Sequence, residues 1–183
     1  MKHTLLAVAS IGLLVQLTVG QEKPMPELTV VPSVDLKQYA GTWYEIARLP
    51  NSFQKECAGQ VTASYVLDGD GIEVTNRCRT EGREWKAAKG RARIANDDGP
   101  NSKLKVRFAP AILSFLPFVW GNYWIIDLAS DYSYAVVGEP DRKYLWILAR
   151  TAKLDDATLE GILERARQKG YDTKNLVMTK QDL

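Results

Sequence analysis

Histidine and cysteine are the scarcest chemically reactive residues of this 183-residue chain. The one histidine is His3, and the two cysteines are Cys57 and Cys78. Once His3 is removed by processing, Ser-His-Asp and Cys-His catalytic sites are excluded, and so are zinc sites that need an imidazole ligand. The sequence also has no glycine-rich loop of the kind that cradles phosphates. We therefore expect no metal and no cofactor.

An excess of positive charge is absent as well. Lysine and arginine total 24 against 22 acidic residues, which gives a formal net charge of +2. Proteins dedicated to nucleic acids carry a much stronger basic balance, so nucleic acid is not an expected partner. With 45% hydrophobic and 25% charged residues, the composition is that of one ordinary globular domain.

The N-terminal segment predicts export. Lys2 and His3 precede an apolar run from Leu5 to Leu17, and small residues follow at Thr18 and Gly20. This pattern predicts a secretory signal peptide over residues 1–20, followed by an extension over 21–35 and one domain over 36–183. The alternative, an uncleaved anchor helix, is disfavoured because the apolar run is shorter than the ~20 residues that a spanning helix needs.

Export decides how the remaining features are interpreted. Residues 18–24 contain no cysteine for lipid attachment, so we expect an unlipidated protein that is periplasmic or secreted, with association with the outer membrane left open. In an oxidising compartment an even pair of cysteines favours a disulfide. A Cys57–Cys78 bridge would stabilise the fold by ~3 kcal/mol on the chain-entropy model.

Short runs rich in Val, Ile, Tyr, Trp and Thr alternate with turn clusters such as Asp68–Gly71 from residue 43 onward. In the clearest runs, apolar residues alternate with polar ones, which predicts antiparallel strands with one buried face. We predict eight strands: Trp43–Leu49, Gln60–Leu67, Ile72–Arg79, Trp85–Ala95, Lys103–Phe108, Tyr123–Leu128, Tyr132–Gly138 and Tyr144–Arg150.

A helix is expected after the last of these strands, which is apolar on both faces and so needs a cover on its outer side. Acidic residues open a segment with an apolar stripe at helical spacing, and Gly170 ends it. The stripe consists of Leu159, Ile162, Leu163 and Ala166. Residues 175–179 predict a short final strand.

Three short motifs resemble those of the lipocalin family. Gly41 and Trp43 open the first strand, Asp131 and Tyr132 stand at a later turn, and Arg150 ends the eighth strand. The surrounding residues are most similar to bacterial lipocalins and apolipoprotein D. The resemblance implies an all-β fold, an eight-stranded antiparallel up-and-down barrel with one C-terminal α-helix packed on its outside. It also implies that Arg150 covers the ring of Trp43 at the closed end, a cation–π contact worth ~1–2 kcal/mol when shielded from water.

The same resemblance implies a carrier for a small hydrophobic ligand, which we expect to be a fatty acid or lysophospholipid. Alternation from Arg150 places Trp146 inside the barrel at mid-depth, beside Tyr65 and Asn76, and the strand ends place Tyr123 at the mouth. Each candidate is alternatively ordinary core. The candidate ligand-binding residues are Tyr65, Asn76, Val106, Phe108, Tyr123, Tyr144 and Trp146.

Several alternatives stay open at this point. An isomerase- or epoxidase-like enzyme acting on an apolar substrate would need an ionisable residue deep in the barrel, and a structural or interaction protein would have a filled interior. The apolar segment 110–120 is a lid, a transient membrane contact, a homodimer surface or a loop packed on its own barrel. Basic residues on the outer faces, from Lys89 to Arg93 and from Lys103 to Arg107, either meet anionic headgroups or are solvated, and we favour the second.

Overall fold

The computed structural model describes residues 25–182. The predicted signal peptide and the first residues of the predicted extension lie outside the described residues. Within residues 25–182, no helix has the length and apolar character needed to cross a membrane.

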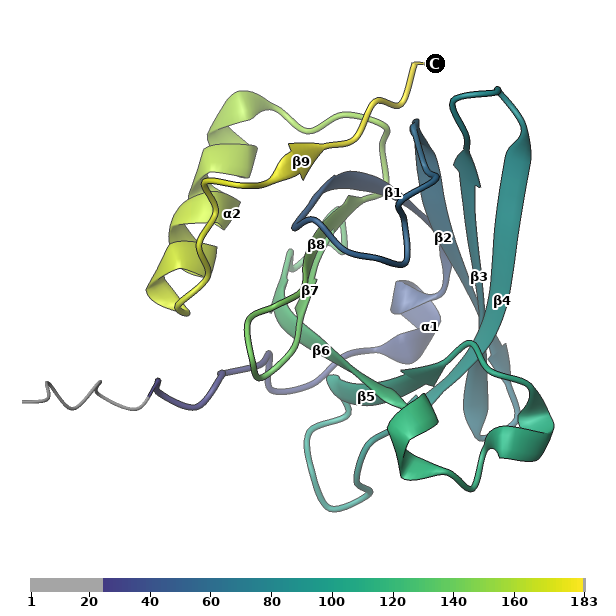
Figure 1. Ribbon diagram of the computed structural model, residues 1–183. Helices are drawn as coiled ribbons and strands as arrows, with labels where there is room; N and C mark the ends of the chain where they lie inside the picture. The colour runs from purple at the N-terminus through teal and green to yellow at the C-terminus, as the bar shows by residue number, and fades with distance from the viewer. Residues whose placement is uncertain (1–24, 183) are drawn as a thin grey trace, which may run out of the picture.

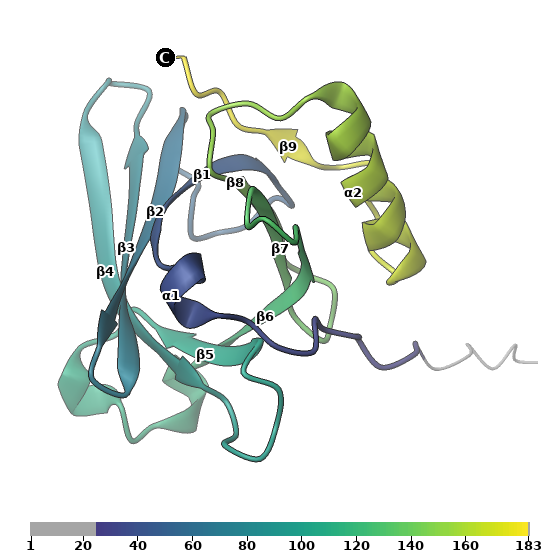
Figure 2. The same ribbon diagram turned by 180° about the vertical axis from the view of Figure 1, so that it is seen from behind.

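Eight antiparallel strands close into a barrel, which Figures 1 and 2 show from opposite sides. Each strand pairs with the next, and the eighth pairs with the first. The predicted eight-stranded fold is confirmed. The strands are β1 (Gly41–Arg48), β2 (Gly59–Asp68), β3 (Gly71–Arg79), β4 (Trp85–Ile94), β5 (Lys103–Arg107), β6 (Gly121–Leu128), β7 (Tyr134–Gly138) and β8 (Leu145–Ala149).

The turn before β7 explains why this strand starts two residues later than predicted. Tyr132 has a φ of 59°, which is uncommon for a residue other than glycine and incompatible with an extended strand. Its hydroxyl accepts a hydrogen bond of 2.8 Å from the backbone N–H of Asp35, and Asp131 accepts one of 3.0 Å from the N–H of Ser133. The Asp131-Tyr132 motif therefore fixes a turn and ties it to the N-terminal segment.

Side chains of the barrel divide between an inner and an outer core. The inner core contains Trp43, Tyr65, Val74 and Leu148 among its buried members. The outer core lies under helix α2 (Asp156–Gln168) and includes Leu145, Ile147 and Ala149 of β8. As predicted, β8 is apolar on both faces because one faces the interior and the other faces the helix.

Helix α2 begins where the sequence predicts it. The Asp155 side chain caps the helix by accepting a hydrogen bond of 2.9 Å from the N–H of Thr158. Gly170, with a φ of +89°, follows the helix in the left-handed conformation that glycine tolerates best. The predicted stripe is confirmed, since Ile162 and Ala166 are buried and Leu159 and Leu163 pack against the same cluster.

The C-terminal segment completes the wall where β1 leaves β2. Pairing between these strands ends at Tyr44 and Thr62, and β1 has an irregularity between Glu45 and Ala47. Strand β9 (Val177–Met178) pairs with the end of β1, and the N–H of Gln60 donates to the carbonyl of Lys180 at 2.7 Å. Residues 177–181 thus fill the seam between β1 and β2.

A single arginine closes one end of the barrel. The Arg150 guanidinium lies 3.7 Å from the centroid of the Trp43 ring and donates to the carbonyls of Gln38, Tyr39, Ala40 and Thr42 at 2.6–3.2 Å. These carbonyls belong to and follow the short helix α1 (Leu36–Tyr39), which Figure 2 shows across this end of the barrel. Gly41 has a φ of +96°, a backbone conformation that glycine adopts without strain.

The opposite end of the barrel is held by the disulfide. Cys57 and Cys78 are bonded, with their Cα atoms 5.5 Å apart, so the predicted bridge is confirmed. It joins the β1–β2 connection to the end of β3. The connections β3–β4, β5–β6 and β7–β8 lie at this same open end because successive strands are antiparallel.

The β5–β6 connection differs from the expectation for the basic face of β5. Arg107 is buried, with 7% of its surface exposed, whereas we expected a solvated side chain. It lies 5.2 Å from the centroid of the Trp120 ring and donates to the carbonyl of Ala109 at 2.8 Å. The prediction for Arg107 is wrong because Trp120 covers it from the adjoining loop.

We predict that Arg150→Met lowers the free energy of unfolding by about 2–4 kcal/mol, because it removes the cation–π contact and leaves four carbonyls without their charged donor. Arg150→Lys should recover only part of the loss, since an ammonium cannot reproduce the planar fork. Urea unfolding followed by circular dichroism measures both. Arg167→Met on the exposed face of α2 is the control and should cost under about 1 kcal/mol; an equal loss in both methionine variants would contradict the assignment.

Candidate functional site

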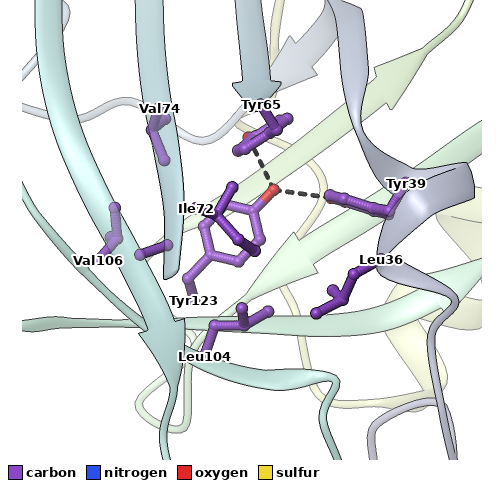
Figure 3. A pocket seen from close by; sticks show the side chains of 9 residues that line it. Leu36, Tyr39, Tyr65, Ile72, Val74, Leu104, Val106 and Tyr123 are labelled. Atoms are coloured by element: carbon purple, nitrogen blue, oxygen red, sulfur yellow. Dashed lines mark hydrogen bonds between the residues drawn. The ribbon is translucent and has the colours of Figure 1, made fainter. Parts of the chain in front are cut away.

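The barrel interior ends in a floor of three tyrosines. The Tyr123 hydroxyl lies 2.7 Å from that of Tyr39 and 2.8 Å from that of Tyr65, and Figure 3 shows it pointing between the two. Tyr39 comes from α1, Tyr65 from β2 and Tyr123 from β6. The floor therefore joins the N-terminal helix to two separate parts of the barrel.

Burial keeps these three side chains neutral. It raises the pKa of Tyr65 to about 12 and raises the pKa values of Tyr39 and Tyr123 well above the ordinary value. Because the folded pKa values exceed the unfolded value of about 10, the associated stability is fully present below that pH. It is lost as the pH rises through the folded values.

The walls above the floor are apolar. The space they enclose admits the centre of a water-sized molecule over about 10 Å³, which is room for about one water. The lower part of the barrel is therefore nearly filled. The residues that line it are Leu36, Tyr39, Tyr65, Ile72, Val74, Ala92, Leu104, Val106 and Tyr123.

The interior is open to solvent in its upper half. Asn76 faces Ala88 across the β3–β4 ladder, and Ala88 is exposed although it shares the inner face with buried Ala92. The Oδ1 atom of Asn76 is buried and has no hydrogen-bond partner. One level lower, a side chain at Gly90 would collide with the Phe108 ring. Solvent therefore reaches the inner face of β4 at Ala88 but not the Asn76 Oδ1 atom, and Phe108 occupies the space at Gly90.

Aromatic rings line the mouth on the opposite wall. Tyr144 and Trp146 stack with ring centroids 5.8 Å apart, and Phe53 of the β1–β2 connection lies 5.3 Å from Tyr144. The indole Nε1 of Trp146 donates to Gln54 Oε1 at 2.9 Å. Trp146 therefore fastens the disulfide-bonded loop to the rim of the barrel.

Two predicted depths are wrong. Trp146 lies near the mouth and not beside Tyr65, because β8 begins only at Leu145 and Tyr65 pairs with Gly41 at the other end of β1. Tyr123 lies at the floor and not at the mouth, because β6 begins two residues before it, at Gly121. Of the seven candidate residues, Tyr65, Val106 and Tyr123 line the lower cavity, Asn76 and Phe108 lie higher on β3 and just after β5, and Tyr144 and Trp146 lie at the rim.

Glu45 is the residue whose importance the sequence analysis missed. Its exposed fraction is 3%, and it shares the parity of Trp43 along β1, which was the available signal. Oε1 accepts hydrogen bonds from Arg48 at 2.9 Å and Thr179 at 2.6 Å. Oε2 accepts one of 2.6 Å from Gln54. Both carboxylate oxygens therefore accept hydrogen bonds, and Glu45 joins β1 to the β1–β2 connection and to the C-terminal segment.

Two further features of the described residues were candidates for a site: a metal-ligand cluster and a second hollow. Among residues 25–182, no cluster of three metal-ligating side chains occurs. A hollow of about 510 Å³ lies outside the barrel at the closed end, between the start of α1 and the β2–β3 turn. It shares Leu36 and Ile72 with the lining of the lower cavity, but its lining also includes Asp35, Lys37 and Asp70, so it is more polar than the interior.

We predict that Tyr123→Phe lowers the free energy of unfolding by about 1–3 kcal/mol, because it leaves the hydroxyls of Tyr39 and Tyr65 without their shared partner. Tyr65→Phe should cost less, since it removes an end hydroxyl and leaves the Tyr39–Tyr123 bond intact. Chemical denaturation at neutral pH measures both. A larger loss in Tyr65→Phe than in Tyr123→Phe would show that the floor does not depend on the central hydroxyl.

Comparison with known proteins finds a matching family and several similar sequences. The family described as "Lipocalin-like domain" matches residues 34–181. Outer membrane lipoprotein Blc of Vibrio cholerae is 39% identical, with coverage of 86% of this chain and 89% of the relative. Temperature-induced lipocalin-1 of Arabidopsis thaliana is 38% identical (85% and 83%), and mouse apolipoprotein D is 31% identical (85% and 82%).

Solved structures share the fold. Insecticyanin from the tobacco hornworm Manduca sexta superimposes with a TM-score of 0.63 at 24% identity, covering 85% of each chain. Lobster apocrustacyanin A1 also gives a TM-score of 0.63, at 20% identity, covering 87% of this chain and 94% of the other. At these identities the likeness supports the architecture of the barrel alone.

Proposed function

Because the chain belongs to the lipocalin family, we propose that it carries or stores a small hydrophobic ligand in its barrel, and that this ligand is a single-chain lipid such as a fatty acid or lysophospholipid. The observation that carries the proposal is the change in polarity along the interior, from the floor to the mouth. Apolar walls lead down to a neutral floor, whereas a partnerless amide oxygen and the aromatic rim lie above. An apolar tail with one polar end matches this gradient. Because the lower cavity has room for about one water, the tail must displace the side chains of its walls as it enters.

The ligand enters tail first in this proposal. The floor hydroxyls of Tyr39, Tyr65 and Tyr123 bond to one another, and no charged side chain lines the cavity above them. A carboxylate placed there would lose its hydration without gaining a counter-charge. The head group therefore stays near the mouth, beside Asn76 and the rings of Tyr144 and Trp146.

An extracytoplasmic location accords with two observations. The relative from Vibrio cholerae bears the name outer membrane lipoprotein, and the Cys57–Cys78 disulfide is of a kind that persists in oxidising compartments. We propose that the protein is exported and works in the periplasm or outside the cell, without a lipid anchor.

The surroundings of the buried carboxylate of Glu45 support a binding protein rather than an enzyme. An enzyme of the isomerase or epoxidase type needs an ionisable group that is free to reach the substrate. Glu45 is buried, but Arg48, Thr179 and Gln54 occupy both of its oxygens. The proposal therefore gives Glu45 a structural role.

We predict that affinity for saturated fatty acids rises with chain length, by about tenfold per two methylenes until the tail fills the interior. Titration monitored by tryptophan fluorescence measures this dependence. An α,ω-dicarboxylic acid of equal length is the matched control and should bind much more weakly, because its second carboxylate would reach the apolar interior. Affinity independent of chain length would refute the carrier, and equal affinity for the two acids would refute tail-first binding.

Trp146→Ala should weaken fatty acid binding, because the indole borders the upper interior and fastens the mouth loop through Gln54. Trp146→Phe keeps an aromatic surface without the hydrogen bond and should weaken binding less. Calorimetric titration below the melting range compares the variants, with unfolding measured in parallel. If Trp146→Ala loses stability but binds fatty acid as the wild type does, Trp146 is a packing residue and not part of the site.

A further inference from the structure

Large apolar side chains project from the open end of the barrel. Ile112, Phe115 and Phe118 of the β5–β6 connection are 80%, 77% and 80% exposed. Phe53 of the β1–β2 connection is 71% exposed, and Trp85 at the start of β4 is 48% exposed. These five residues, which we call the apolar rim, lie in or directly beside connections that antiparallel topology places at the same end.

The β5–β6 connection is anchored beside the barrel and does not act as a cover. Its Trp120 ring packs against Arg93, 4.5 Å from the ring centroid, and its Nε1 donates to the carbonyl of Ser114 at 2.7 Å. Two short 3-10 turns, η1 (Ala111–Leu113) and η2 (Pro117–Val119), stiffen the connection between β5 and β6. Figure 1 shows these turns next to β4 and β5, at the edge of the barrel. The exposed tips therefore project from a fixed base.

Basic side chains without acidic partners lie next to this base. Lys89 and Arg93 of β4 and Lys105 of β5 alternate on the outer face with residues of the inner face. Within residues 25–182, none of these three forms an ion pair, although Arg91 between them pairs with Asp68. Lys89 and Lys105 therefore form a positive wall beside the β5–β6 connection, whereas Arg93 holds the Trp120 ring and borders the hollow at the closed end.

We propose that the apolar rim and the adjoining basic wall dock the open end of the barrel on an anionic lipid surface. In this arrangement Ile112, Phe115 and Phe118 enter the acyl layer and Lys89 and Lys105 meet the headgroups. Isolated projecting side chains suit a fluid layer, whereas a protein partner would need a pocket for each. A second copy of this chain would bring two like-charged walls together.

The purpose of this docking rests on the proposed function. A mouth held at the membrane allows a lipid to pass between bilayer and barrel without crossing water. Docking itself needs no bound ligand. The two proposals can therefore fail separately.

Vesicle flotation of the processed protein tests the docking surface. Vesicles of phosphatidylcholine are compared with vesicles of phosphatidylcholine mixed with phosphatidylglycerol, and we expect stronger binding to the mixture. The variant Ile112→Ser/Phe115→Ser/Phe118→Ser should bind the mixed vesicles on the order of a hundredfold more weakly. Val66→Ser/Leu67→Ser, which removes exposed apolar residues near the closed end, should bind as the wild type does.

The charge contribution is tested by Lys89→Gln/Lys105→Gln. This pair should weaken binding to the mixed vesicles roughly twentyfold and leave binding to phosphatidylcholine unchanged. Lys37→Gln/Lys153→Gln, at the closed end, is the matched control and should have little effect. All substituted side chains lie at the surface, and thermal unfolding verifies that each variant is folded.

Three results would overturn the proposal: vesicle binding by the triple serine variant equal to that of the wild type, equal binding of the wild type to both compositions, or a triple variant that changes only from dimer to monomer in sedimentation velocity. The last result would make a second copy the occupant. Fatty acid titration without vesicles separates the two proposals, because the triple variant should bind fatty acid normally. A wild type that binds vesicles but no fatty acid would refute the carrier and leave the docking surface intact.

Discussion

The contact of Arg150 with Trp43 and four backbone carbonyls holds the closed end of the barrel together. The carbonyl ends of α1 and of the residues after it have few partners within so short a helix, and the guanidinium supplies five donors in a rigid plane. The same segment carries Tyr39, whose ring lies 5.0 Å from that of Trp43 and whose hydroxyl reaches Tyr123. The position of the tyrosine floor therefore depends on an arginine that never enters the interior.

Polar groups have different hydrogen-bond partners at the two ends of the interior. At the floor, two hydrogen bonds join three buried hydroxyls, so each hydroxyl has at least one partner. Near the mouth, Gln54 bridges Glu45 and Trp146, whereas Asn76 keeps an oxygen without a partner. Among the polar atoms of the interior, the unpartnered Asn76 oxygen is therefore the one that a ligand near the mouth could satisfy.

Local patterns predicted the strands and the helix well, because alternation, turn residues and caps act over a few residues. The disulfide was predicted instead from expected export and the even number of cysteines. Depth inside the barrel depends instead on where each strand starts and on its partner's register. An extra two residues at the start of β6 moved Tyr123 to the floor, and the late start of β8 left Trp146 at the rim. Arg107 was misjudged because the ring that covers it belongs to a neighbouring loop. Helix α1 has only four residues, too few for a helical period to be visible.

The seam between β1 and β2 has a consequence for the order of assembly. Gln181 donates to the carbonyls of Glu45 and Val61, and Thr179 reaches the Glu45 carboxylate; these contacts join residues up to 136 positions apart. A chain that emerges N-terminus first from a ribosome or a translocation pore cannot make them until nearly all of it has emerged. Glu45 and the edge of β1 therefore lack these partners until the C-terminal segment arrives, so closure of this seam comes late in folding.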